Sequence, residues 1–190
     1  MKAVISAAVL FAASGFGQQA GMDALKRELE EVARVATVMV DGDVCQRIET
    51  PRSAQFQLKK DPRDPWIASD NYDVRHDAFI LTKKVLMRLA RLTKFPCDVN
   101  LWMPLPVKPP RIQAVVRNVN EMSQFWTFGV LNQDMPPEMR KVLETGERVT
   151  VTRRAGMVSV LAPVYNSLDE IASLVEVVGR IEVDPSENVK

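Results

Sequence analysis

The run from Gly146 to Val178 constrains the fold more than any other part of the chain. It reads GERVTVTRRAGMVSVLAPVYNSLDEIASLVEVV. Three strand patterns follow one another in it, separated by turn signals at Ala155-Gly156 and Asn166–Glu170: Arg148–Thr152, Met157–Pro163 and Ile171–Val178. Short apolar or alternating runs divided by such turns predict a meander of three antiparallel strands. A sheet of this kind needs helices or further strands to cover its apolar side.

Two amphipathic helices upstream supply that cover. Met22–Val40 and Asp73–Leu92 both repeat apolar residues at steps of three and four, with charged residues on the opposite side. The stripe of the first helix is Leu25, Leu29, Val32, Ala33, Ala36 and Met39. The stripe of the second helix is Val74, Ala78, Leu81, Val85, Leu89 and Leu92. Both stripes are expected to lie against the sheet.

Two more strands and a short helix complete the predicted order. Asp98–Met103 and Arg111–Val119 form a hairpin, and Pro137–Thr145 forms a helix with proline in its first turn and Gly146 as its C-cap. Asp43–Ser69 is expected to be loop with short helical pieces, and its DPRDPW sequence to be a turn. We therefore expect one α+β domain over residues 21–183, followed by a polar tail, 184–190.

The first 20 residues have the pattern of a cleaved signal peptide. Lys2 precedes the apolar stretch Ala3–Phe16, and small residues follow it, so that cleavage is expected after Gly17 or Ala20. The apolar stretch is shorter than the roughly 20 residues that a membrane-spanning helix needs. The sequence therefore predicts a periplasmic or secreted protein without a transmembrane segment in its mature chain.

Export gives the two cysteines, Cys45 and Cys97, two alternatives. In an oxidising compartment they form one disulfide, and closing a loop of about 50 residues stabilises the fold by about 4 kcal/mol in the chain-entropy model. Otherwise they are two separate buried thiols, which pack as small apolar residues. The sequence does not decide between the two.

Charge and motifs exclude several functions. The chain has 25 basic and 24 acidic residues, and loss of Lys2 with the signal peptide makes the numbers equal, which disfavours nucleic acid as a partner. A single histidine, His76, leaves neither a catalytic triad nor a zinc-binding spacing. The glycines form no phosphate-binding loop. We predict no enzymatic activity, no metal and no cofactor.

The final strands resemble those of a known family. TGERVTV, GMVSVLAPVYN and EIASLVEVV are similar to the last three strands of PAS-like extracytoplasmic sensor domains of the Cache superfamily. The resemblance implies a five-stranded antiparallel sheet with the long N-terminal helix on one face. It also implies that short helices and the segment after the second strand cap the other face and enclose a small-ligand pocket. No match to the family's amino-acid-binding motif is present, so no ligand class follows.

Five residues are candidates for that ligand pocket. Small-molecule sites are mostly apolar with a few placed polar groups, and an arginine among aromatic side chains can hold a carboxylate. The candidates are Trp102 and Arg117 from the first two strands, Trp126 and Phe128 from the segment that should cap the sheet, and Tyr165 from the end of the fourth strand. The alternative is that the aromatic side chains fill the core and Arg117 faces water.

Two non-enzymatic functions remain open from the sequence. The first is an exported, sensor-type domain that binds a small molecule of unknown class. The second is a non-enzymatic interaction or structural protein on the same fold, paired with a partner protein or with a second copy through the N-terminal helix.

Overall fold

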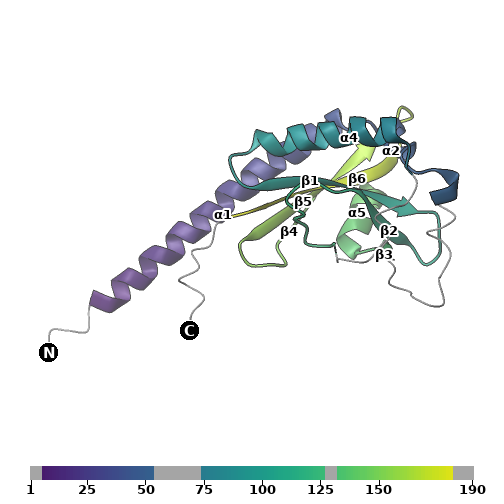
Figure 1. Cartoon of the computed structure of the whole chain (residues 1–190). Helices are drawn as coiled ribbons and strands as arrows, with labels where there is room; N and C mark the ends of the chain where they lie inside the picture. Colours follow the sequence, from purple (N-terminus) through teal and green to yellow (C-terminus); the bar gives the residue numbers. More distant parts are fainter. Residues whose placement is uncertain (1–5, 54–73, 127–131, 182–190) are drawn as a thin grey trace, which may run out of the picture.

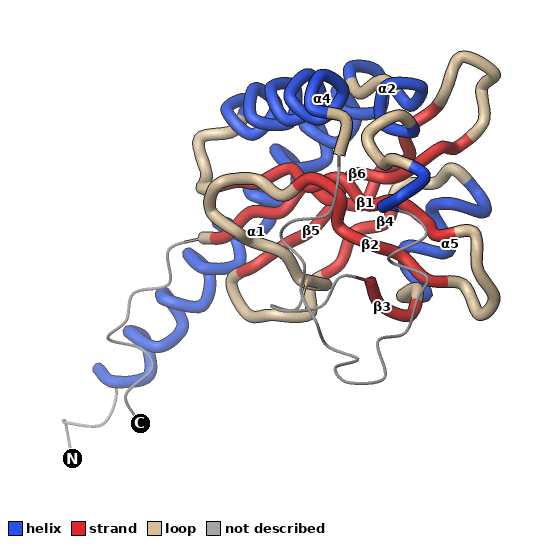
Figure 2. The backbone as a smooth tube through the Cα atoms, turned by 45° about the vertical axis from the view of Figure 1, so that its right-hand side comes forward, coloured by secondary structure: helices blue, strands red, loops and turns tan. Residues whose placement is uncertain are grey.

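The fold is built on one antiparallel sheet with helices on both faces (Figures 1 and 2). The computed structural model describes residues 6–53, 74–126 and 132–181. Its strands are β1 (Cys97–Leu105), β2 (Arg111–Val116), β3 (Asn132–Asp134), β4 (Val149–Val151), β5 (Met157–Tyr165) and β6 (Ile171–Arg180). Its helices are α1 (Ser6–Met39), α2 (Gly42–Gln46), α4 (His76–Leu89), which continues as the 3-10 turn η1 (Ala90–Leu92), and α5 (Pro137–Thr145). The α+β class and the predicted antiparallel sheet are confirmed.

The sheet has six strands, so the prediction of five was wrong. Their order is β3-β2-β1-β6-β5-β4, with the predicted hairpin β1–β2 and the predicted meander β4–β5–β6 both present. The additional strand, β3, pairs with the start of β2 at Arg111, Ile112 and Gln113. It is three residues long, Asn-Gln-Asp, and therefore has no alternation or β-branched residue by which a strand is recognised. The Arg111 side chain ties β3 in place through Asp134, at 3.0 Å.

Helix α1 covers one face of the sheet, as predicted. Leu25, Leu29, Val32, Ala33 and Ala36 are buried, and α1 lies against β5 and β6. Helix α1 approaches the backbone of β6 closely because β6 has a glycine there. A Cβ on Gly179 would lie 3.0 Å from Leu25 Cδ1. Met39, the last residue of the predicted apolar stripe, is 57% exposed, and Val40 is buried instead. This is because α1 ends at Met39 and the chain turns there.

The N-terminal part of α1 extends the helix beyond its predicted start at Met22. The helix begins at Ser6 and runs past the edge of the sheet (Figure 1). None of the helices among the described residues is long and apolar enough to cross a membrane. The signal peptide stays a prediction, as does the polar tail 184–190, which lies outside the described residues together with the DPRDPW sequence.

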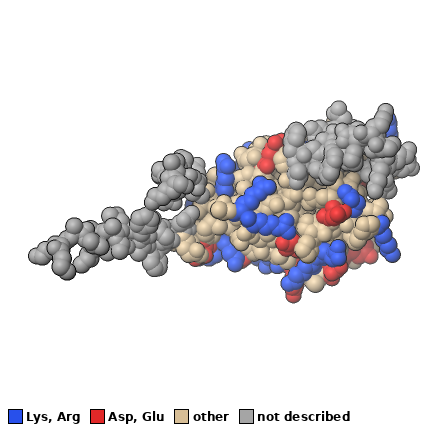
Figure 3. Space-filling view, turned by 90° about the horizontal axis from the view of Figure 1, so that it is seen from below, with Lys and Arg blue, Asp and Glu red and all other residues tan. Residues whose placement is uncertain are grey.

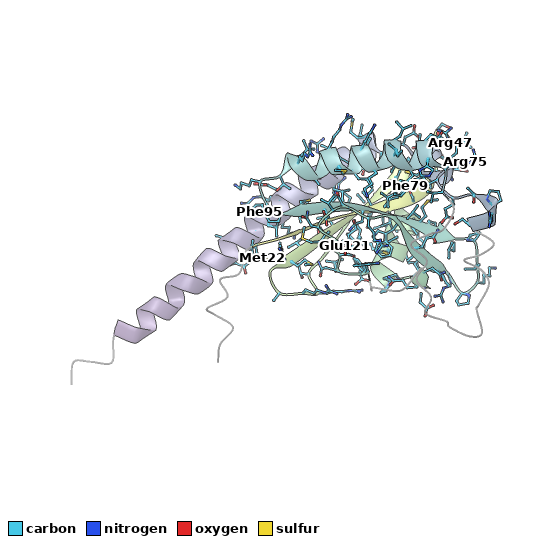
Figure 4. The ribbon with its side chains drawn as sticks, viewed as in Figure 1. Met22, Arg47, Arg75, Phe79, Phe95 and Glu121 are labelled. Carbon is cyan, nitrogen blue, oxygen red and sulfur yellow. The ribbon has the colours of Figure 1, made fainter. Side chains whose placement is uncertain are left out.

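Helix α4 lies on the same face, and most of its predicted stripe faces the core. Ala78 and Leu89 are buried, and Val74 and Val85 pack against the core. Leu81 and Leu92 are instead 54% and 60% exposed, and Thr82 and Leu86 are buried, because the hydroxyl of Thr82 makes part of the buried side look polar in the sequence. Phe79, on the same helix, packs against the core between α4 and the sheet (Figure 4).

The opposite face is covered by α5 and by an irregular stretch, residues 118–126, which we call the cap segment. Helix α5 has the predicted bounds, and Gly146 ends it in the left-handed region with φ 71°. Its buried residues Met139 and Val142 pack with Trp102 and Phe125 in a second apolar cluster. The position of the cap segment on this face agrees with the prediction that the stretch after the second strand covers the sheet.

The cysteines occupy separate places in the core. Cys45 lies on α2 and Cys97 begins β1, and the structure has both as free, buried thiols. Of the two alternatives, the disulfide is therefore not formed. Burial raises the pKa of each thiol to about 12.

We expect these thiols to resist modification in the native protein. A shift of the pKa from 9.0 to about 12 lowers the thiolate fraction at pH 8 by roughly a thousandfold, and burial blocks access as well. A thiol reagent should therefore react with Cys45 and Cys97 only after denaturation, and should then count two thiols without added reductant. A count of zero in denatured, unreduced protein would instead show a disulfide.

Candidate functional site

Buried polar side chains line the face of the sheet under the cap segment. Asp98 and Asn100 on β1, Ser159 on β5 and Glu176 on β6 are all at most 2% exposed. They alternate with Val99, Val158 and Val175, which face α1 and α4 on the other side. A buried polar group is costly unless it has hydrogen-bond partners. The partners of this row come mainly from the cap segment.

Glu176 is the centre of the network. Its Oε1 accepts hydrogen bonds from the backbone N–H of Gln124 at 2.9 Å and from Ser159 Oγ at 2.7 Å. Its Oε2 accepts from Ser123 Oγ at 2.6 Å and from the indole Nε1 of Trp102 at 3.2 Å. Burial raises the pKa of Glu176 above its ordinary value, and these four hydrogen bonds, which act in the opposite sense, do not cancel that effect.

The direction of one hydrogen bond is fixed by its surroundings. Ser123 Oγ accepts the backbone N–H groups of Phe125 and Trp126, both at 3.0 Å. A hydroxyl has two lone pairs and one proton, so Ser123 must use its proton toward Glu176. The carboxyl of Glu176 therefore holds the backbone of residues 123–126 in place, directly at Gln124 and through Ser123 at the next two residues.

Asp98 anchors the other half of the cap segment. Its Oδ1 accepts from Asn120 N at 3.3 Å and Asn120 Nδ2 at 2.9 Å, and its Oδ2 accepts from Met122 N at 2.9 Å. Glu121 lies between them with φ 52°, on the side of the sheet away from α4 (Figure 4). Backbone N–H groups around a left-handed residue form a concave anion site, which here encloses the carboxylate of Asp98.

Two amide side chains complete the attachment. Asn100 Nδ2 donates to Met122 O at 2.8 Å, and Asn100 Oδ1 accepts from Asn118 N at 3.0 Å. Gln124 points the other way: its Nε2 donates to Val151 O at 2.7 Å, and its Oε1 accepts from Arg154 N at 3.2 Å. The cap segment is thus tied to β1, β4, β6 and the turn after β4 without belonging to the sheet.

Two arginines stack on neighbouring aromatic residues of the cap segment. The guanidinium of Arg153 lies 4.6 Å from the ring centre of Phe125, and its Nη2 donates to both carboxylate oxygens of Glu138 at 2.7 Å. The guanidinium of Arg117 lies 4.6 Å from the ring centre of Trp126. Seen from below, the surface of the described residues mixes basic and acidic side chains (Figure 3).

The structure brings together some of the predicted site residues. Trp102, Arg117 and Trp126 are all on the cap side, but Trp102 is 2% exposed and is a core residue there. Tyr165 lies at the end of β5, where its hydroxyl faces Gly146 after α5. Phe128 lies outside the described residues. Arg117 and Trp126 are therefore the pair of predicted residues that are in direct contact.

Sequence reasoning missed the residues that hold the cap segment. A signal for them does exist, because Asp98, Asn100 and Glu176 interrupt apolar strands at alternate positions, where a polar residue indicates a second face. A solvated face would explain the same pattern. Only the burial of these residues shows that a segment of the chain covers them.

The fold and the site together define an α+β protein whose six-stranded antiparallel sheet carries a hydrogen-bonded cap on one face. Compared with known proteins, the chain matches no protein-family model, and no curated protein sequence matches it at a significant level.

Proposed function

We propose that the chain is an exported, PAS/Cache-like domain that binds a small ligand carrying a carboxylate and does not catalyse a reaction. The arrangement of elements supports the proposal: a long helix covers one face of an antiparallel sheet, and the stretch after the second strand covers the other. The observation that carries it is the stack of Arg117 on Trp126.

A stacked arginine is well suited to an anionic ligand. The aromatic ring holds the flat side of the guanidinium, so the N–H groups at its edge stay in one plane and match the two oxygens of a carboxylate. The chain itself contains a related pair. Arg153 stacks on Phe125 at the same distance, 4.6 Å, and its Nη2 donates to both carboxylate oxygens of Glu138. The proposal gives Arg117 the same role toward a ligand.

The proposal leaves Glu176 and Asp98 out of any reaction. Their carboxyl oxygens are occupied by donors of the chain itself, and both side chains are fully buried. Their part is to fix the backbone that positions Trp126. The ligand site then needs only a rigid aromatic surface and a cation.

Thermal denaturation with small carboxylates, amino acids and purines tests the proposal. A carboxylate at one hundred times its dissociation constant should stabilise the chain by about 2.7 kcal/mol, which raises the melting temperature by about 5–10 °C for a domain of this size. The shift should disappear in Arg117→Ala and in Trp126→Ala. Arg117→Lys should lose most of it, because lysine keeps the charge without the planar group.

Lys83→Ala is the matched control, since Lys83 also lies over an aromatic ring, that of Phe79 at 5.8 Å, but on α4. It should leave the ligand shift unchanged. A shift that persists in Arg117→Ala would place the ligand elsewhere, and the absence of a shift with every compound would contradict the proposed ligand class.

The alternative function is an interaction or structural protein that pairs through the N-terminal helix. Helix α1 leaves less exposed apolar surface for such pairing than the sequence suggested. The apolar stripe of α1 is buried in the core of its own chain. Val38 and Met39, at the end of α1, are 79% and 57% exposed. Sedimentation of the protein with Val38→Ser and Met39→Ser checks this alternative, which requires a dimer that these substitutions dissociate.

A further inference from the structure

The backbone N–H groups of residues 124–126 share one titratable acceptor, although the side chains of Gln124 and Phe125 make further contacts with β4, the turn after it and the apolar cluster. The N–H of Gln124 bonds directly to Glu176, and the N–H groups of Phe125 and Trp126 reach it through Ser123. In the first half of the cap segment, Asn118 is instead held by the neutral amide of Asn100. A change in the charge of Glu176 therefore acts on residues 123–126 in particular.

The closed arrangement can accommodate a proton on Glu176. Trp102 Nε1 and Gln124 N can only donate, and the lone pairs of Ser123 are used, so none of these three can accept from a protonated carboxyl. Ser159 has one hydrogen bond, to Glu176 Oε1, and its hydroxyl can rotate to accept instead. The neutral acid thus keeps its four contacts beneath the cap segment, while the hydroxyl proton of Ser159 gives up its acceptor.

The ionised form of Glu176 is not neutralised by its neighbours beneath the cap segment. Around Glu176, β1 presents Asn100 and Trp102, β5 presents Ser159 and Leu161, and α5 presents Met139 and Val142. Charged groups of the described residues on or next to the cap side include Asp98 on β1, bound by residues 120–122, and Glu121 in the cap segment itself. Arg153 after β4 is bound to Glu138 of α5, Arg111 on β2 is bound to Asp134, and Arg117 lies over Trp126. An ionised Glu176 would therefore be relieved chiefly by contact with water, which requires residues 123–126 to lift.

We propose that residues 123–126 form a proton-linked strap, which is closed over the sheet while Glu176 carries a proton and is released when Glu176 ionises. The inference concerns the strap itself and stands whether or not a ligand binds at Arg117 and Trp126.

The direction of the pH effect on the strap follows from the pKa of Glu176 in the closed and open states. Burial raises the pKa of Glu176 in the closed state, while contact with water returns it toward 4.5 in the open state. The closed state therefore binds the proton more tightly. The opening constant of the strap is expected to rise about tenfold per pH unit from pH 4.5 up to the pKa of the closed state, and to level off above it.

Two NMR measurements on the whole chain test the strap. The indole N–H of Trp102 donates to Glu176 Oε2, so its chemical shift should titrate with a midpoint above 4.5 in the wild-type protein. Hydrogen exchange of the Gln124, Phe125 and Trp126 amides, corrected for the intrinsic effect of pH, should lose protection over the same range. The amide of Asn118 should stay protected.

Glu176→Gln should abolish both effects, and Glu147→Gln, the same change at an exposed carboxylate, should abolish neither. An indole shift that stays flat between pH 4.5 and 9 overturns the proposal, as does a titration without any change in exchange at residues 124–126. Both of these outcomes are read from the wild-type protein, so failure of Glu176→Gln to fold does not remove the test.

Discussion

Replacement of Glu176 by leucine is expected to lower the free energy of unfolding by about 5 kcal/mol, near the upper limit for a single substitution. Leucine resembles glutamate in volume but accepts no hydrogen bond. The indole N–H of Trp102 and the backbone N–H of Gln124 would stay buried without an acceptor, and each such donor costs about 1–3 kcal/mol. The two serine hydroxyls bonded to Glu176 add to this loss. Urea denaturation measures the difference.

Ser159→Ala is the matched control for that substitution. It removes one of the four donors and leaves the acceptor in place, so it should cost about 1 kcal/mol. If Glu176→Leu costs no more than Ser159→Ala, water reaches the donors of the cap segment, and the sealed network described above does not exist in solution.

The parts of the fold that the sequence predicted are those with local signals. Helix α5 was predicted to the residue because Pro137 suits the first turn and Gly146 takes a left-handed conformation that favours glycine. The meander was predicted because Gly156 marks a turn between an alternating run and an apolar run. Each of these signals lies within a few residues of the element that it specifies.

The cap network could not be predicted, because its contacts join distant residues. Ser123 and Gln124 meet Glu176 across more than 50 positions, and nothing near Glu176 indicates its partners. The register adds a second obstacle, since an irregularity between Leu101 and Trp102 changes the pairing of β1 with β2. For this reason the sequence could not predict on which side of the sheet Trp102 and Arg117 lie. For the same reason, the sequence offered the aromatic residues as site candidates and passed over the carboxyl groups beneath them.

The second large effect is expected at Gly42, where helix α2 begins. Asp41 caps the helix through the N–H of Val44 at 3.1 Å, and Asp43 accepts the N–H of Ser167 at 2.9 Å, so the corner after α1 is docked against the end of β5. A Cβ on Gly42 would lie 2.4 Å from the carbonyl oxygen of Tyr165. Because the opposing atoms are backbone, they cannot move aside without separating α2 from the sheet. Gly42→Ala should cost about 3 kcal/mol or more.

Gly21→Ala is the matched substitution with the opposite expected sign. Gly21 lies inside α1, and the nearest atom that its Cβ would meet is Ile181 Cγ2, at 4.0 Å. In the uncleaved chain, in which α1 begins at Ser6, alanine should stabilise the helix by about 0.5–1 kcal/mol, because it restricts the unfolded chain and favours helix. Thermal denaturation should therefore move the two variants in opposite directions, by about 2–4 °C for each kcal/mol. If Gly42→Ala is tolerated as well as Gly21→Ala, α2 does not pack against the end of β5 as closely as the structure has it, and the attachment of α1 to the sheet rests on its buried apolar stripe alone.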